Sequence, residues 1–130
     1  MASQSTGLNG NAPFGISITL TARADAGVLG SWQNTTGKSV LILTRGIVVT
    51  AASTGAATVD AGIATTAVTN DTLIDGQALN GVAANTVVQT AGSNGALSRI
   101  VAAGSYVTAF GSADTTGFTG TFELLCLELS

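Results

Sequence analysis

Apolar and polar residues alternate along much of this chain with a period of two, which is the pattern of β-strands that bury one face. The clearest run places Phe14, Ile16, Ile18 and Leu20 on one side, and small or polar residues on the other. Similar runs recur, separated by short segments rich in Gly, Asn, Asp, Ser and Thr. We expect strands at residues 14–21, 28–34, 39–50, 57–64, 86–90, 97–101, 105–110 and 118–129.

Some segments depart from this alternation. Arg45-Gly46 interrupts an apolar, β-branched series within residues 39–50, which predicts a β-bulge there. Residues 65–81 lack the alternation, and we expect them to be irregular. Their turn chemistry comes from Asn70-Asp71, Asp75-Gly76 and Asn80-Gly81. Turns that end in Thr-Gly predict a positive φ at Gly37, Gly55 and Gly117.

The same patterns indicate the fold class. No segment of helical length has a 3.6-residue period, so the chain is expected to be all-β. Seven to nine short strands with frequent turns are typical of a single β-sandwich, and a jelly roll is the variant that we favour. The sandwich is expected over residues 14–130.

Residues 1–13 differ from the rest of the chain. They are small, polar and rich in Asn and Gly, and they end at the only proline, Pro13. Such a segment buries too little apolar surface to order itself. We expect an extended N-terminal arm that is disordered alone or lies against a partner, and a frayed terminus is the alternative.

The last expected strand is apolar on both faces near its end. One face carries Phe118, Phe122, Leu124 and Cys126. From residue 125 onward the other face is apolar too, with Leu125, Leu127 and Leu129. A strand that is apolar on both faces is covered on both. In a chain of this size the second cover is expected to come from another subunit, so these three leucines are the candidate subunit interface.

Charge is scarce in this chain. Charged residues make up 8% of the sequence and the net charge is −3, whereas about a quarter of an ordinary domain is charged. So few charges suit a subunit whose neighbours cover its surface. The four basic residues are scattered, which argues against nucleic-acid binding. No run approaches the ~18 apolar residues of a membrane span, and the first residues do not form a secretory signal, so we expect a cytoplasmic product.

Candidate reactive groups are few. The chain has no histidine, which excludes Ser-His-Asp and Cys-His arrangements and the usual zinc sites. Most of its seven carboxylates lie in or beside turns, and none has the spacing of a calcium loop. The lone Cys126 is expected to be a buried apolar side chain. Trp32 and Tyr106 are more typical of a core than of a sugar-stacking platform. We therefore expect no enzyme activity, cofactor, metal or small-molecule substrate.

Several segments resemble small structural proteins of tailed bacteriophage heads. The resemblance covers roughly residues 36–125, and its motifs consist of turn and strand residues without reactive groups. They are GKSVLILTRGIVVT (37–50), AASTGAATVDAGIA (51–64), DTLIDG (71–76), SNG (93–95), AAGSYVTA (102–109) and TGFTG (116–120).

The resemblance implies a capsid decoration, or cement, protein. Such a protein is a β-sandwich, commonly a homotrimer, that sits on the outer surface of the virion head and clamps neighbouring major capsid proteins. No residue-level site transfers, because the shared motifs have structural roles. On this hypothesis the arm contacts the shell through Ala2, Ser3, Gln4, Asn9, Asn11 and Pro13. The alternatives are a tail- or fibre-associated virion protein and a carbohydrate-binding host-attachment module.

Overall fold

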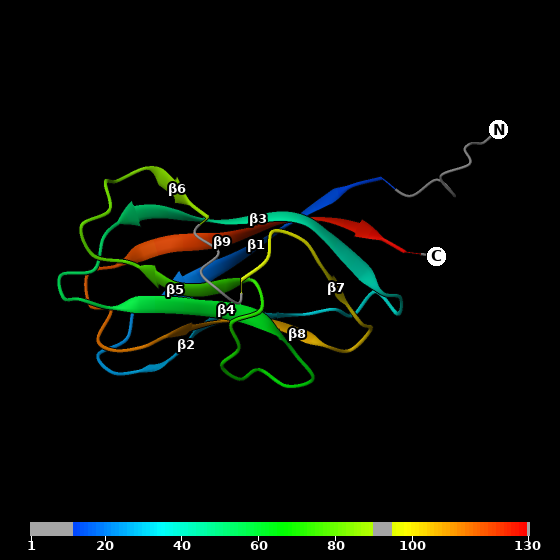
Figure 1. Cartoon of the computed structure of the whole chain (residues 1–130), viewed down its shortest axis with the longest axis horizontal. Helices are drawn as coiled ribbons and strands as arrows, with labels where there is room; N and C mark the ends of the chain where they lie inside the picture. The colour runs from blue at the N-terminus through cyan, green and yellow to red at the C-terminus, as the bar shows by residue number, and fades with distance from the viewer. Residues whose placement is uncertain (1–11, 90–94, 130) are drawn as a thin grey trace.

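The computed structural model describes residues 12–89 and 95–129, which fold into two β-sheets packed face to face (Figure 1). Nine strands and no helix occur within these ranges. The prediction of an all-β sandwich is therefore confirmed.

The first sheet has the strand order β1-β9-β3-β6, and β7 also pairs with β3. Its strands are β1 (Phe14–Thr21), β3 (Val40–Ala51), β6 (Thr86–Val88), β7 (Arg99–Val101) and β9 (Thr119–Glu128). The second sheet has the order β2-β8-β4-β5. Its strands are β2 (Gly27–Gln33), β4 (Thr58–Ala64), β5 (Ile74–Ala78) and β8 (Tyr106–Gly111). All pairs of these strands are antiparallel.

The core lies between the two sheets and comes from the inward residues of each strand. Phe122 and Cys126 of β9 and Ile47 of β3 are fully buried there, as are Val59 of β4 and Val107 of β8. Burying one large apolar side chain contributes about 1.5–3 kcal/mol, so this alternating set supplies the main force that holds the sheets together. The inward face predicted for β1 is also confirmed.

The bulge predicted at Arg45-Gly46 lies elsewhere. Both residues pair in register with β9, and the register shifts at Leu43 instead. The extra residue at Leu43 brings Arg45 to the inner side, where it is 1% exposed. Gly46 has a different role, because a Cβ there would lie 2.9 Å from Cγ1 of Val87. The prediction was wrong because a close approach between strands also favours glycine.

The expectation for residues 65–81 was also wrong in part, since β5 lies within them. The Asp75-Gly76 pair forms a bulge inside that strand: Gly76 has a φ of 70°, and the register with β4 shifts there. Its N–H donates to Oδ1 of Asp60 at 2.7 Å. Turn chemistry therefore hid a strand that contains a bulge. The predicted positive φ is found at Gly37 and Gly117 but not at Gly55.

Most connections cross from one sheet to the other, except those from β4 to β5 and from β6 to β7. The chain passes from β1 in the first sheet to β2 in the second, and returns to the first sheet at β3. The last strand, β9, lies between β1 and β3, and Phe14 pairs with Cys126. The start of β1 and the end of β9 are therefore neighbours at one end of the sandwich.

Candidate interaction surface

The outer face of the first sheet, which we call the β3–β9 face, is apolar at one end and polar at the other. At the apolar end, Ile100, Leu41 and Leu127 form a row across β7, β3 and β9. Leu125 lies in the next row of the same face. Hydroxyl side chains occupy the opposite end, at Ser17, Thr19, Thr21, Thr119 and Thr121.

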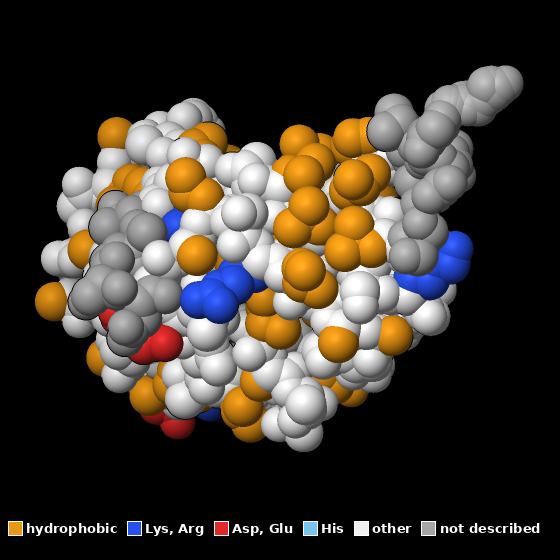
Figure 2. Space-filling model, turned by 45° about the vertical axis from the view of Figure 1, so that its right-hand side comes forward, with side chains coloured by type: hydrophobic (Ala, Val, Ile, Leu, Met, Phe, Trp, Pro, Cys, Tyr) orange, Lys and Arg blue, Asp and Glu red, His pale blue; other side chains and the backbone are white. Residues whose placement is uncertain are grey.

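Exposed apolar side chains are concentrated on this sheet. The large exposed hydrophobic residues of the described chain, between 37% and 58% exposed, are Leu43, Val68, Val87, Leu97, Ile100 and Leu125. Four of them lie on β3, β6, β7 and β9, and Leu97 lies two residues before β7. Figure 2 shows hydrophobic side chains gathered in one group between basic side chains. Exposed apolar side chains gathered on one face are typical of an interaction site.

The β3–β9 face also has a hollow of about 240 Å³. Val87 of β6 and Leu125 of β9 line it from two sides, and the backbone at Gly46 lines it between them. The hollow exists because Gly46 has no side chain and Val87 leans over it. It is mainly apolar, and its charged lining residues are Glu123 and the buried Arg45.

Glu123 connects the hollow to the polar end of the face. Its Oε2 accepts a hydrogen bond from Oγ of Ser17 on β1 at 2.5 Å. No ion pair of Glu123 occurs within residues 12–89 and 95–129. A carboxylate with one hydroxyl partner retains acceptor capacity for a donor from outside the chain.

Arg45 lies beneath the β3–β9 face, on the inner side of β3. Its Nε donates to the carbonyl oxygen of Leu73 at 2.8 Å, and its Nη1 donates to the carbonyl oxygen of Gln89 at 2.7 Å. Nε2 of Gln89 donates back to the carbonyl oxygen of Arg45 at 2.9 Å. Burial lowers the pKa of Arg45. Nη2 is buried without a hydrogen-bond partner among the described residues. The guanidinium therefore supports the sheet through Nε and Nη1, which tie β3 to the carbonyl groups of Leu73 and Gln89.

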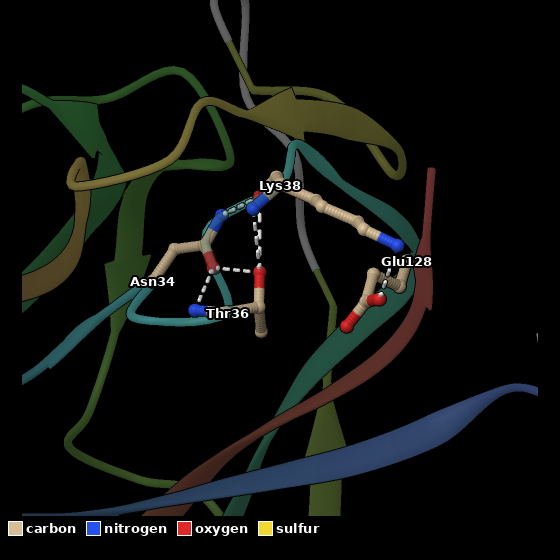
Figure 3. Close-up of polar contacts among 4 residues, drawn as sticks. All are labelled: Asn34, Thr36, Lys38 and Glu128. Carbon is tan, nitrogen blue, oxygen red and sulfur yellow. Dashed lines mark hydrogen bonds and ion pairs between the residues drawn. The ribbon is translucent and has the colours of Figure 1, made fainter. Parts of the chain in front are cut away.

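The turn between β2 and β3 is fixed by side-chain hydrogen bonds and linked to the end of β9 (Figure 3). Oδ1 of Asn34 accepts from Oγ1 of Thr36 at 2.7 Å, and Nδ2 of Asn34 donates to the carbonyl oxygen of Lys38 at 2.8 Å. Nζ of Lys38 lies 3.6 Å from Oε1 of Glu128. This partly exposed ion pair contributes at most about 1 kcal/mol, but it keeps β9 beside the turn.

Part of the outer face of the second sheet, around Gly62, is covered by the chain itself. A Cβ on Gly62 of β4 would lie 2.2 Å from Oδ1 of Asn70 and 2.7 Å from Oγ1 of Thr72. These two side chains are held in place, because Asn70 Oδ1 accepts from the Thr72 N–H and Thr72 Oγ1 accepts from the Ile63 N–H, both at 3.0 Å. Thr108, paired with Gly62 on the neighbouring strand, is only 1% exposed.

The three leucines predicted for the subunit interface lie at the apolar end of the β3–β9 face. Leu125 is 42% exposed, and Leu127 and Leu129 are half-buried. Of the residues predicted to contact the shell, Pro13 is exposed. The others, Ala2, Ser3, Gln4, Asn9 and Asn11, lie outside the described residues, so their role stays a prediction.

Reactive chemistry is sparse in the described part of the chain. No group of three or more Cys, Asp or Glu residues there has the arrangement of a metal site. Cys126 is fully buried, as expected, and burial raises its pKa to about 11. Trp32 is half-buried and packs against the core, as expected for a single aromatic residue in a strand.

Sequence reasoning missed part of this face. Leu41 and Leu43 follow the same logic as the end of β9, because residues 40–43 are apolar at every position. That run indicates a strand that is apolar on both faces. Val87 and Ile100 had no such signal, since their strands are only three residues long.

Comparisons of this chain with protein-family models, with curated proteins and with solved structures found no match. Within the described ranges, no helix has the length and apolar character that a membrane crossing requires.

Proposed function

We propose that this chain is a structural virion protein of the capsid decoration type. It binds the outer surface of a phage head, as a homotrimer, and strengthens contacts between major capsid proteins. The observation that carries the proposal is the β3–β9 face, where leucine, isoleucine and valine side chains are exposed together on one sheet. A surface of this kind needs a protein partner, and a charge-poor chain suits a permanent assembly.

We also propose that the sandwich is a jelly roll. If β7 is set aside, the first strand pairs with the last (β1 with β9) and the second with the next-to-last (β2 with β8). Toward the middle of the sequence, β3 pairs with β6, and β4 pairs with β5. This nesting is what a long antiparallel hairpin gives when it is rolled into two sheets, as in many capsid domains.

The mechanism would be the burial of protein surface at many equivalent contacts, whose stabilising contributions add up over the shell. A standard interface buries about 1,600 Å², and a decoration protein repeats its interface at many symmetric positions on the shell. Small contributions at each position then oppose the separation of neighbouring capsid subunits. Residues 1–13 would extend the contact across the shell, while the leucines of β9 join sister chains.

Imaging of the intact particle, at a resolution that places each chain, tests the proposal. Many copies distributed over the head are expected. A few copies at one vertex would replace the proposal with the tail- or fibre-associated alternative. Absence from the particle would overturn both.

A deletion of residues 2–12 tests the arm separately. We expect the variant to keep its oligomeric mass and to lose most of its binding to heads that lack the native protein. Head binding at the wild-type level would contradict the role of the arm. A matched control is Val68→Asp, which changes an exposed apolar residue on the loop after β4 and is expected to bind like the wild type.

A further inference from the structure

The longest strand of the described chain, β3, is paired very differently along its two sides. On one side β9 pairs with it over almost its whole length, from Val40 to Ala51. On the other side, within the described residues, β7 pairs with positions 40–42 and β6 with positions 47–49. Between these two strands, Nε2 of Gln89 donates to the carbonyl oxygen of Arg45 at 2.9 Å. Two strands of only three residues each therefore cover this edge of β3.

The part of the edge beside β7 is suited to pairing with other chains. Residues 39–44 read SVLILT, with four consecutive apolar residues and no charged residue. A six-residue segment with high β-propensity and no charge is the kind that pairs with copies of itself. When the edge of such a segment is uncovered, its backbone N–H and C=O groups are a template for a strand from another molecule. The covering of residues 40–43 by β7 therefore affects how copies of this chain associate.

The strand β7 itself has the features of an edge to which no further strand is added. It is three residues long. Arg99 pairs with Ile42, whose side chain is fully buried, so Arg99 leaves β7 on the inner side of the sheet and is nevertheless exposed. A strand added beside β7 would bury this charge. Short edge strands and inward-pointing charges are two ways in which proteins prevent association through sheet edges.

Asn34 anchors this short strand from the turn between β2 and β3. Its Nδ2 donates to the carbonyl oxygen of Val101 at 3.0 Å and to that of Lys38 at 2.8 Å (Figure 3). Its backbone N–H donates to the carbonyl oxygen of Ser105 at 2.9 Å, and its carbonyl oxygen accepts from the Gly104 N–H at 2.8 Å. Asn34 is fully buried, as is the side chain of Val101. A three-residue strand makes few ladder hydrogen bonds, so these contacts decide how firmly β7 is held.

We propose that β7 is a guard strand, which covers an edge of β3 that would otherwise pair with a second copy, and that Asn34 anchors it. While Asn34 holds Val101, the first sheet ends at a short strand with an inward charge. When this contact is lost, β7 leaves β3, and residues 40–43 pair with the same segment of a second copy. A chain with so few charges needs such a device, because charge repulsion does little to keep its copies apart. The inference goes beyond the proposed function and does not rest on it.

Asn34→Asp tests the anchor, and Thr36→Val is the matched control. The aspartate keeps an oxygen acceptor for Thr36 but has no amide donor for Val101. Thr36→Val removes the hydroxyl that Oδ1 of Asn34 accepts from and leaves the donor to Val101 in place. We expect N34D to speed hydrogen exchange of residues 97–105 at least about tenfold relative to residues 14–21, and T36V to leave this ratio unchanged. Faster exchange of all strands by one factor in N34D would make Asn34 a general stabiliser and overturn the proposal.

A disulfide between β7 and β3 tests the consequence for association. Leu41 and Ile100 lie directly opposite each other. Opposite residues of antiparallel strands have Cα atoms about 4.5–5.5 Å apart, which a disulfide accommodates. In N34D/L41C/I100C we expect the reduced protein to form β-rich aggregates at least about tenfold faster than the oxidised protein, followed by light scattering and thioflavin fluorescence. The buried Cys126 does not compete for the disulfide. Equal rates for the two forms would show that release of β7 does not control association.

The wild type decides the matter if N34D does not fold. Native-state hydrogen exchange in urea, below the unfolding midpoint, should open residues 97–105 at a lower urea concentration than β1 and β9. Oxidised L41C/I100C, with Asn34 in place, should remove this difference. Opening of all three strands at the same urea concentration in the wild type would overturn the proposal, because β7 would then have no separate open state.

Discussion

The outer faces of the two sheets differ in how their own chain covers a glycine at the middle of the sheet. Each has a glycine on an inner strand, Gly46 on β3 and Gly62 on β4, and each glycine lets other side chains lie against the sheet. Over Gly62 these are Asn70 and Thr72, whose polar atoms are hydrogen-bonded within the chain. Over Gly46 the side chain of Val87 remains 58% exposed and borders a hollow. Around Gly62 the second face is therefore covered by its own chain, whereas around Gly46 the first face keeps an exposed apolar side chain, which is where the proposed function expects a partner.

The largest expected effect concerns the support beneath the open face. Arg45→Ala removes the donors to the carbonyls of Leu73 and Gln89 and leaves a cavity between the sheets. We expect the free energy of unfolding to fall by about 3–5 kcal/mol. Arg45→Met fills the space without a buried charge and should cost clearly less, because the guanidinium has an unpartnered nitrogen in the described structure. Urea denaturation of both variants measures the difference, and equal losses would contradict this account of Arg45.

The glycines give the direct test of the comparison. Gly62→Ala must displace Asn70 and Thr72 and break their hydrogen bonds, so we expect a loss of about 1–3 kcal/mol. Gly46→Ala meets Cγ1 of Val87 at 2.9 Å and Cγ of Gln89 at 3.3 Å. Because Val87 is 58% exposed, a shift of this side chain breaks no hydrogen bond, and we expect a loss of less than about 1 kcal/mol. Thermal and urea denaturation of the two variants measure this difference. If Gly46→Ala were the more destabilising change, the first face would be as tightly completed as the second.

Thiol accessibility compares the two sides of one strand. Cys126 faces the core, and burial raises its pKa to about 11, so its thiol should resist labelling at pH 8 until the protein unfolds. Leu125→Cys places a thiol on the outer side of β9, where we expect labelling at least roughly tenfold faster in dilute protein. At concentrations where copies associate, that labelling should slow and the core thiol should stay unchanged. A rate at residue 125 that is independent of concentration would show that no partner copy covers this side.

The sequence predicted the sandwich well because period-two alternation is local. It placed β1, β4 and β9 and the inward residues of each, including Cys126, and it found the apolar outer side of β9 from three leucines. The prediction from the sequence failed at two glycines, because glycine is favoured in turns, in bulges and at close approaches between strands alike. Gly76 looked like a turn and lies in a strand, and Gly46 looked like a bulge and allows a close approach.

The hollow could not be predicted from the local pattern of apolar and polar residues. It requires Val87, Gly46 and Glu123 to meet through the registers of β6, β3 and β9, which are distant in the sequence. The chain pattern indicates which residues face outward. It does not indicate which outward residues of different strands become neighbours.

The smallest expected effect lies in the turn before β9, which joins the covered second sheet to the open first one. Hydrogen bonds from Thr116 hold the pKa of Asp114 below its usual value, and its Oδ1 accepts from the Thr116 N–H at 2.8 Å. A carboxyl with a depressed folded-state pKa stabilises the fold above its unfolded pKa, near pH 4, and that contribution is lost as the pH falls toward the folded value. Asp114→Asn keeps the oxygen acceptor and removes the charge, so its stability should vary less than that of the wild type between pH 5 and pH 2. Urea midpoints across this range measure the slope, and identical slopes would assign the acid sensitivity to other carboxylates. Because this turn contributes to neither outer face, labelling of Leu125→Cys should be the same with Asp or Asn at position 114, which separates loss of the turn from loss of the interface.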